Sequence, residues 1–77
     1  MRIEVRLLLS FKEKAPDGEK LFELELSPGA TVTDALESLR IPSSSAKVIV
    51  VNGRTSKSGQ ELKNGDQLTV FPPLEGG

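Results

Sequence analysis

The side chains that carry most enzyme chemistry are missing from this chain of 77 residues. It contains no cysteine, histidine, tryptophan or tyrosine, so it has no thiol nucleophile, no imidazole base, no disulfide and none of the usual nitrogen or sulfur ligands of zinc. The carboxylates between Glu13 and Glu25 are spread along one predicted hairpin, and a hydrolase built from them would need a deeper pocket than so short a chain supplies. We therefore predict that the chain is not an enzyme on its own and holds no metal.

One reactive group remains, at the end of the segment Phe71-Pro72-Pro73-Leu74-Glu75-Gly76-Gly77. Because glycine lacks a Cβ, a Gly-Gly end can pass in extended form through a narrow tunnel in another protein. Pro72-Pro73 stiffens the base of this tail. The special group of Gly77 is its α-carboxylate, a poor electrophile until it is activated, for example as an acyl adenylate, after which it can accept sulfur or an amine. The alternative is a terminus without a role.

Charge and aromatic content argue against two classes of partner. Ten basic and eleven acidic residues give a net charge of -1, and three phenylalanines are the only aromatic residues. A basic stripe and a stacking platform for bases are both missing, so we expect no nucleic-acid partner. The longest apolar run is Val48–Val51, far short of the ~20 residues that span a bilayer. We expect no membrane association, no signal peptide and a cytoplasmic location.

Two alternating segments predict the first two strands. In Met1–Leu9, apolar residues at 3, 5, 7 and 9 alternate with charged residues at 2, 4 and 6, which is the period of a half-buried strand. The same alternation returns in Phe22–Leu26. The segment between them contains a turn signal at Ala15-Pro16-Asp17-Gly18, so the two strands are predicted to form a hairpin with a long loop.

A single main helix is predicted next. Thr31 and Asp34 have the spacing of a capping box, with Asp in place of the usual Glu or Gln. One apolar face of this helix is formed by Val32, Ala35, Leu36 and Leu39. Because Pro42 disfavours the α region at Ile41, the helix is expected to end near Arg40.

The last third of the chain predicts two further strands. The run of β-branched residues in Lys47–Val51 is followed by the turn dipeptide Asn52-Gly53. By contrast, Arg54–Lys63 is polar and is expected to be a loop. A second tight turn, Asn64-Gly65-Asp66, leads into the last strand, Gln67–Phe71.

These elements predict an α+β fold in which one main helix covers one face of a mixed sheet of four to five strands. The first and last strands are expected to be central and parallel, because both alternate cleanly and neither contains a proline. Pro72-Pro73 prevents further pairing, so we assign residues 1–72 to the domain and 73–77 to a flexible tail.

The second face of this sheet has no helix to cover it. Most of its positions on the first two strands are charged, but some apolar residues would lie on or near it: Leu8, Leu21, one parity of Val48–Val51, and Phe71. Scattered exposed apolar residues are normal, whereas a contiguous group marks a docking surface for a protein partner. The pattern alone is compatible with both interpretations.

Nearly the whole chain resembles the MoaD/ThiS family of ubiquitin-like sulfur carriers, which have the β-grasp fold. The resemblance rests on the order of the elements, on Val51-Asn52-Gly53 and Asn64-Gly65-Asp66, and on the terminal Phe71–Gly77. Phe-Pro-Pro-x-x-Gly-Gly after a Gly-Asp turn and a final strand is more specific than Gly-Gly alone. It favours MoaD, the small subunit of molybdopterin synthase.

This resemblance implies a function and a set of site residues. Gly77 would be adenylated and converted to a thiocarboxylate that donates sulfur in the biosynthesis of molybdopterin, the Mo/W cofactor. Gly76 would thread into the active site of a partner. The partner-binding residues at the base of the tail would be Phe71, Pro72, Pro73 and Leu74.

The resemblance also implies partners. These are an adenylating enzyme of the ubiquitin-activating type (MoeB/ThiF-like), a large synthase subunit (MoaE-like) and a sulfurtransferase as the sulfur source. ATP and Mg²⁺ would be used by the activating enzyme, and this chain would bind no cofactor of its own. Three alternatives stay open: a ThiS-like carrier for thiamin thiazole or another metabolite, a ubiquitin-like modifier joined to lysine through Gly77, and a non-covalent interaction domain with an incidental Gly-Gly end.

Overall fold

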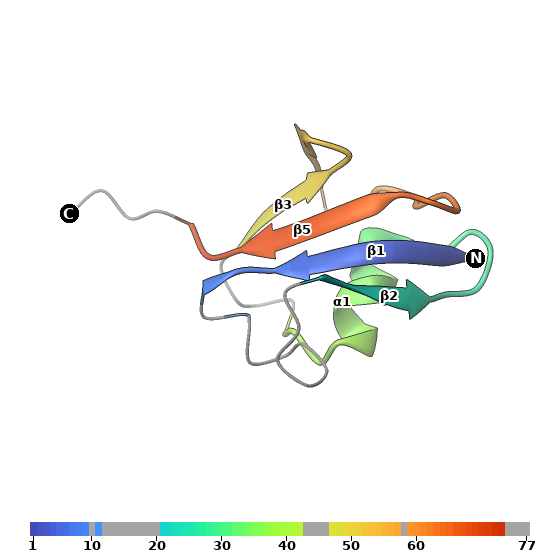
Figure 1. Ribbon diagram of the computed structural model, residues 1–77, viewed down its shortest axis with the longest axis horizontal. Helices are drawn as coiled ribbons and strands as arrows, with labels where there is room; N and C mark the ends of the chain where they lie inside the picture. The colour runs from blue at the N-terminus through green and yellow to red at the C-terminus, as the bar shows by residue number, and fades with distance from the viewer. Residues whose placement is uncertain (10, 12–20, 43–46, 58, 74–77) are drawn as a thin grey trace.

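The computed structural model describes residues 1–9, 11, 21–42, 47–57 and 59–73, which form a mixed sheet with a helix against it (Figure 1). In chain order the elements are β1 Arg2–Leu7, β2 Leu21–Glu25, α1 Val32–Ser38, β3 Val48–Val51, β4 Arg54–Thr55 and β5 Gln67–Phe71. The predicted turn at residues 15–18 and most of the predicted tail lie outside the described residues.

The strand order is β2-β1-β5-β3-β4. β1 and β5 are parallel neighbours, with Val5 paired to Leu68, while β2 and β3 pair antiparallel to β1 and β5. This confirms the prediction that the first and last strands are central and parallel. Because parallel strands run in the same direction, the C-terminal ends of β1 and β5 lie at one edge of the sheet, where the chain leaves β5 (Figure 1).

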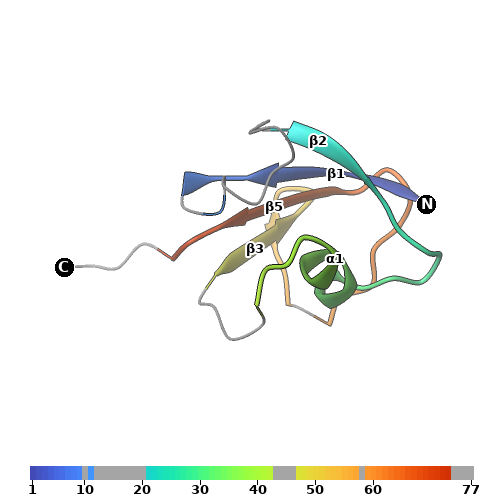
Figure 2. The same cartoon turned by 90° about the horizontal axis from the view of Figure 1, so that it is seen from below.

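The core lies between the sheet and α1 (Figure 2). Successive side chains of a strand point to opposite faces, so the alternating pattern buries one side of each central strand. The buried side of β1 consists of Ile3, Val5 and Leu7. The helix contributes Val32, Ala35 and Leu36. Among the described residues every buried side chain is apolar, so hydrophobic packing supplies the stability of this part of the chain.

α1 begins with the predicted capping box. Thr31 Oγ1 accepts a hydrogen bond from the Asp34 amide at 3.3 Å, and Asp34 Oδ2 accepts one from the Thr31 amide at 2.9 Å. These two bonds satisfy backbone donors that have no partner within the first turn.

In the described ranges no helix has the length and hydropathy needed to cross a membrane.

α1 ends close to the predicted Arg40, but the cause differs from the expected effect of Pro42. The Ile41 amide donates to the Leu36 carbonyl at 2.9 Å, and the Arg40 amide donates to the Glu37 carbonyl at 3.0 Å. Arg40 has a φ of 60°. Together these features form a Schellman motif, in which the chain reverses through one left-handed residue that is usually glycine.

Replacing Arg40 by glycine should therefore stabilise the domain. Glycine adopts a positive φ without the steric cost that any Cβ adds, so Arg40→Gly should raise the free energy of unfolding by roughly 0.5–1 kcal/mol. Urea denaturation followed by circular dichroism measures this change. Arg40→Ala is the matched control, because it shortens the side chain but keeps the Cβ, and it should give no gain. A less stable Arg40→Gly protein would contradict the explanation.

The prediction of a loop over Arg54–Lys63 is wrong at its start. Arg54 and Thr55 form β4 and pair with Val51 and Val50 of β3, and Leu62 is buried in the core. The physical reason lies in the preceding dipeptide, where Asn52 has a φ of 52° and Gly53 a φ of 82°. Two consecutive positive φ values make a two-residue hairpin turn, which places the next residues opposite β3 whatever their polarity.

Candidate functional site

The base of the predicted tail is the end of β5. Phe71 is the last residue of this strand and pairs with Val48 of β3, and Pro72 and Pro73 follow it, each partly buried. Three predicted site residues lie outside the described residues: Leu74, Gly76 and Gly77. Because β5 is hydrogen-bonded to β1 on one side and to β3 on the other, the centre of the fold fixes the position from which the chain leaves the sheet.

A partly exposed apolar surface lies beside this position on the face of the sheet away from α1. Phe71 pairs with Val48, and Val50 points to the same side because it lies two residues further along β3. Next to β5, the Leu8 amide donates to the Val70 carbonyl at 3.0 Å, which continues the pairing of β1 and brings Leu8 level with Phe71. We call Leu8, Val48, Val50 and Phe71 the tail-end patch.

Leu21, the other predicted apolar residue of this face, is separate from the tail-end patch. It is 48% exposed and pairs with Arg6, which in turn pairs with Thr69 of β5. A charged side chain therefore lies between Leu21 and β5. Of the apolar residues expected on or near the uncovered face, Leu8, Val48, Val50 and Phe71 adjoin one another, whereas Leu21 is a single exposed residue on the edge strand β2.

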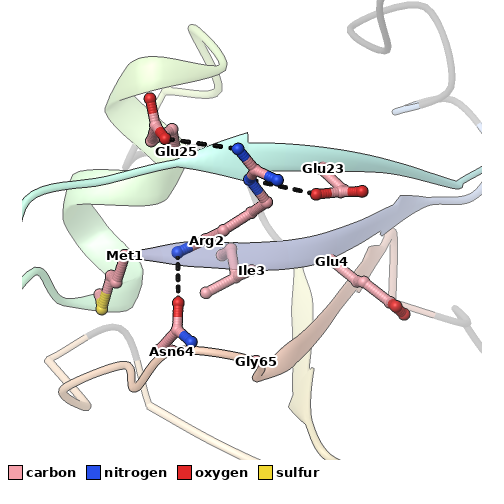
Figure 3. Close-up of a pocket in the computed structure, with 8 residues that line it drawn as sticks. All are labelled: Met1, Arg2, Ile3, Glu4, Glu23, Glu25, Asn64 and Gly65. Atoms are coloured by element: carbon pink, nitrogen blue, oxygen red, sulfur yellow. Dashed lines mark hydrogen bonds and ion pairs between the residues drawn. The ribbon is translucent and has the colours of Figure 1, made fainter.

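The opposite end of the same face is polar. Arg2, Glu23 and Glu25 are among the residues that line a pocket there (Figure 3). Arg2 Nε lies 3.2 Å from Glu23 Oε2, and Arg2 Nη2 lies 3.7 Å from Glu25 Oε1. All three side chains are more than half exposed, so these ion pairs contribute little to stability. Gln67 Nε2 donates to Glu4 Oε2 at 3.2 Å nearby. The face thus changes from charged at the start of β5 to apolar at its end.

Within the described ranges, no three acidic, histidine or cysteine side chains are grouped so that they could hold a metal ion, and no polar or charged side chain is buried. Enzyme sites instead usually combine an enclosed pocket with buried titratable groups. What the described part of the chain offers is an apolar patch beside the point from which the C-terminal segment leaves a rigid sheet.

Leu9 is an exposed apolar residue at this end of the sheet. It is not among the predicted site residues. Alternation places it with residues 3, 5 and 7 on the buried side, but β1 ends at Leu7 and Leu9 is 64% exposed. The prediction for Leu9 is therefore wrong. The run Leu7-Leu8-Leu9 was the available signal, because three consecutive residues of one strand cannot all point into the core.

A mixed five-stranded sheet with a parallel central pair and one helix on one face is the β-grasp fold of ubiquitin-like proteins. The predicted fold class is confirmed, and the tail-end patch adds a surface from which the C-terminal segment is presented. Residues 5–77, including the whole predicted tail, match the sequence profile of the ThiS family. The chain belongs to the ThiS family.

Several solved structures are similar to this chain. SAMP1 from Haloferax volcanii is 26% identical, with a TM-score of 0.80 over 100% of both chains. A Pyrococcus furiosus protein assigned as molybdopterin converting factor subunit 1 is 29% identical, with a TM-score of 0.77 over 95% of this chain and 98% of that one. A chain in the Helicobacter pylori complex of subunits 1 and 2 of molybdopterin-converting factor is 22% identical, with a TM-score of 0.67 over 100% of both chains, and this likeness concerns the fold alone. No curated protein sequence matches the chain significantly.

Proposed function

We propose that this chain is a sulfur carrier whose C-terminal Gly77 is adenylated and then converted to a thiocarboxylate. The observation that carries the proposal is the family match, which extends through Gly76-Gly77. The geometry adds support, because the segment that bears Gly77 leaves the centre of the sheet directly beside the tail-end patch. In this proposal the chain is not an enzyme and works in the cytoplasm beside ATP-dependent partners.

The proposed chemistry requires little of this chain. An oxygen of the Gly77 carboxylate attacks the α-phosphorus of ATP, pyrophosphate leaves, and an acyl adenylate forms. A sulfur nucleophile at the oxidation level of sulfide then adds to the acyl carbon and AMP leaves, which gives the thiocarboxylate. The MoeB/ThiF-like enzyme supplies the ATP and Mg²⁺ site. A sulfurtransferase supplies the sulfur from a persulfide, and a thiol reductant, oxidised to a disulfide, brings that sulfur to the sulfide level. The absence of cysteine is no obstacle, because the sulfur is carried on the backbone carboxylate.

Each predicted tail residue has a physical role in this proposal. Gly76 lets the end enter a narrow channel because it has no Cβ. Pro72 and Pro73 direct the segment away from the sheet, since each fixes φ and lacks an amide donor. Phe71 and Leu74 contact the partner protein, and Phe71 does so as part of the tail-end patch.

We further propose that the sulfur is donated to molybdopterin synthesis through a MoaE-like large subunit. The Phe71-Pro72-Pro73 sequence before the tail supports this pathway, as does the 29% identity to the Pyrococcus furiosus protein assigned as molybdopterin converting factor subunit 1. The test is to mix the thiocarboxylated chain separately with a MoaE-like subunit plus its pterin substrate and with a thiazole-forming enzyme plus its substrates. If the chain loses its sulfur only in the mixture with the thiazole-forming enzyme, a ThiS-like role would replace the proposed role in molybdopterin synthesis.

A protein modifier is the second candidate, because SAMP1, a small archaeal modifier protein, matches the full length of this chain at 26% identity. Here a lysine amine, rather than a sulfur nucleophile, would displace AMP from the activated Gly77. The two functions share the activation step and differ only in what attacks the acyl carbon.

Intact-mass spectrometry separates these functions. The chain is co-expressed with a ubiquitin-activating-type enzyme and a sulfurtransferase and then purified. The carrier proposal predicts the mass increase for exchange of one oxygen atom for one sulfur atom. Higher-mass adducts linked through lysine would instead establish a modifier. A chain that stays unmodified with every candidate activating enzyme would overturn both and leave a non-covalent interaction domain.

A further inference from the structure

Leu9 combines two features that do not favour folding of the isolated domain. Its side chain is 64% exposed, the most exposed of the large apolar side chains among the described residues. Its φ of 55° lies in the left-handed region, where the Cβ of a bulky residue approaches the following carbonyl oxygen. Glycine or asparagine would adopt the same backbone more readily, and neither would expose apolar surface to water.

The conformation of Leu9 is held from both sides. The preceding amide, that of Leu8, donates to the Val70 carbonyl of β5 at 3.0 Å. Beyond Leu9, the Phe11 amide donates to the Leu8 carbonyl at 3.2 Å, and the Phe11 side chain packs against the hydrophobic core. Leu9 is therefore an exposed leucine at a fixed place rather than on a freely moving end. A backbone segment that is already ordered loses less conformational entropy when it binds a partner.

Leu9 is next to the tail-end patch along the chain. It directly follows Leu8, which belongs to that patch and lies level with Phe71. β1 and β5 end at the same edge of the sheet (Figure 1). Leu9 follows the end of β1 by two residues, so it lies near the edge where the chain leaves β5. A protein that receives the C-terminal segment and covers the tail-end patch would therefore meet Leu9 as well.

We propose that Leu9 is an anchor residue that inserts into an apolar pocket of the activating enzyme. This inference rests on the proposed function. The occupant is the activating enzyme, because carrier and modifier chemistry both begin with adenylation of Gly77. An apolar side chain seated in a pocket beside a flatter patch fixes the register of two proteins.

The test is the rate of ATP–pyrophosphate exchange catalysed by a ubiquitin-activating-type enzyme as the concentration of this chain is varied. Leu9→Asn should raise KM for the chain about tenfold and leave kcat unchanged, because it removes a docking contact and no reacting group. The same substitution should raise Tm by a few degrees, since asparagine suits the left-handed backbone and is polar. A residue needed only for folding would lower Tm instead. Leu9→Met keeps an apolar side chain and should restore most of the wild-type KM.

Two control variants test whether the effect on KM is specific to Leu9. The first removes another exposed leucine, and the second removes another residue with a positive φ. Leu21→Asn removes the other exposed leucine, which lies away from the tail-end patch, and should leave KM unchanged. Arg40→Gly relieves a second left-handed residue and should raise Tm with no effect on KM. If Leu9→Asn and wild type have equal KM values, the proposal that Leu9 is an anchor residue is wrong, while the proposed function stands. If the wild-type chain supports no exchange with any activating enzyme, both fail. Leu9→Gly repeats the measurement if the asparagine variant does not fold.

Discussion

Removing Gly77 should abolish thiocarboxylate formation and leave the fold unchanged. The shortened chain still ends in a carboxylate, now on Gly76, but that group lies about 3.5 Å short of its proper position along an extended segment. A reacting atom displaced by this distance from the α-phosphorus of ATP is far outside the near-attack geometry on which catalysis depends. Among the described residues, the buried hydrophobic core lies between Ile3 and Val70, so the free energy of unfolding should change by less than about 0.5 kcal/mol.

Intact mass after co-expression with the activating and sulfur-transfer enzymes measures the first effect, and urea denaturation measures the second. Glu75→Gln serves as the matched control, because it changes the same segment but keeps its length and both glycines, and it should still acquire sulfur. A chain without Gly77 that gains sulfur as wild type does would show that the thiocarboxylate forms elsewhere. Loss of both sulfur and stability would mean that the last residue contributes to the fold.

The sequence predicts the centre of this fold well because the centre is where the hydrophobic pattern is strongest. In β1 and β5, alternate residues are apolar and the residues between them are polar or charged, so only one arrangement buries the apolar set. The Thr31–Asp34 capping box is equally local, since two side chains three residues apart satisfy each other's backbone groups. These features require no knowledge of distant parts of the chain.

The departures from prediction depend on local backbone geometry. Leu9 adopts a positive φ although leucine does not favour it, and β1 ends at Leu7, two residues before the predicted end of the strand. β4 forms because the turn at Asn52-Gly53 aligns polar residues with β3, not because those residues favour a strand. Tertiary contacts, such as the bond from the Leu8 amide to the Val70 carbonyl, determine these positions.

Replacing Phe71 should produce the largest loss of partner binding among single changes in the described domain. Phe71 is the aromatic member of the tail-end patch and immediately precedes the segment that must enter the activating enzyme. Aromatic residues at the centre of an interface typically contribute 2 kcal/mol or more, so Phe71→Ser should weaken binding by at least about 30-fold. Isothermal titration of the activating enzyme without ATP measures this change separately from chemistry. A loss of about 1 kcal/mol in stability should accompany it, because Phe71 pairs with Val48 across the sheet.

Gln67→Ser is the matched control for this prediction, since Gln67 lies on the same strand and the same face as Phe71 but at the polar end. It should bind as wild type does, and Phe71→Leu should retain most of the affinity because it keeps apolar area. The reverse result, a strong effect at Gln67 and none at Phe71, would place the partner over the ion pairs of Arg2. In that arrangement the enzyme would cover the end of β5 opposite to the segment it must modify. Docking at the tail-end patch avoids this problem, because contact surface and reactive group then lie at one edge of a rigid sheet.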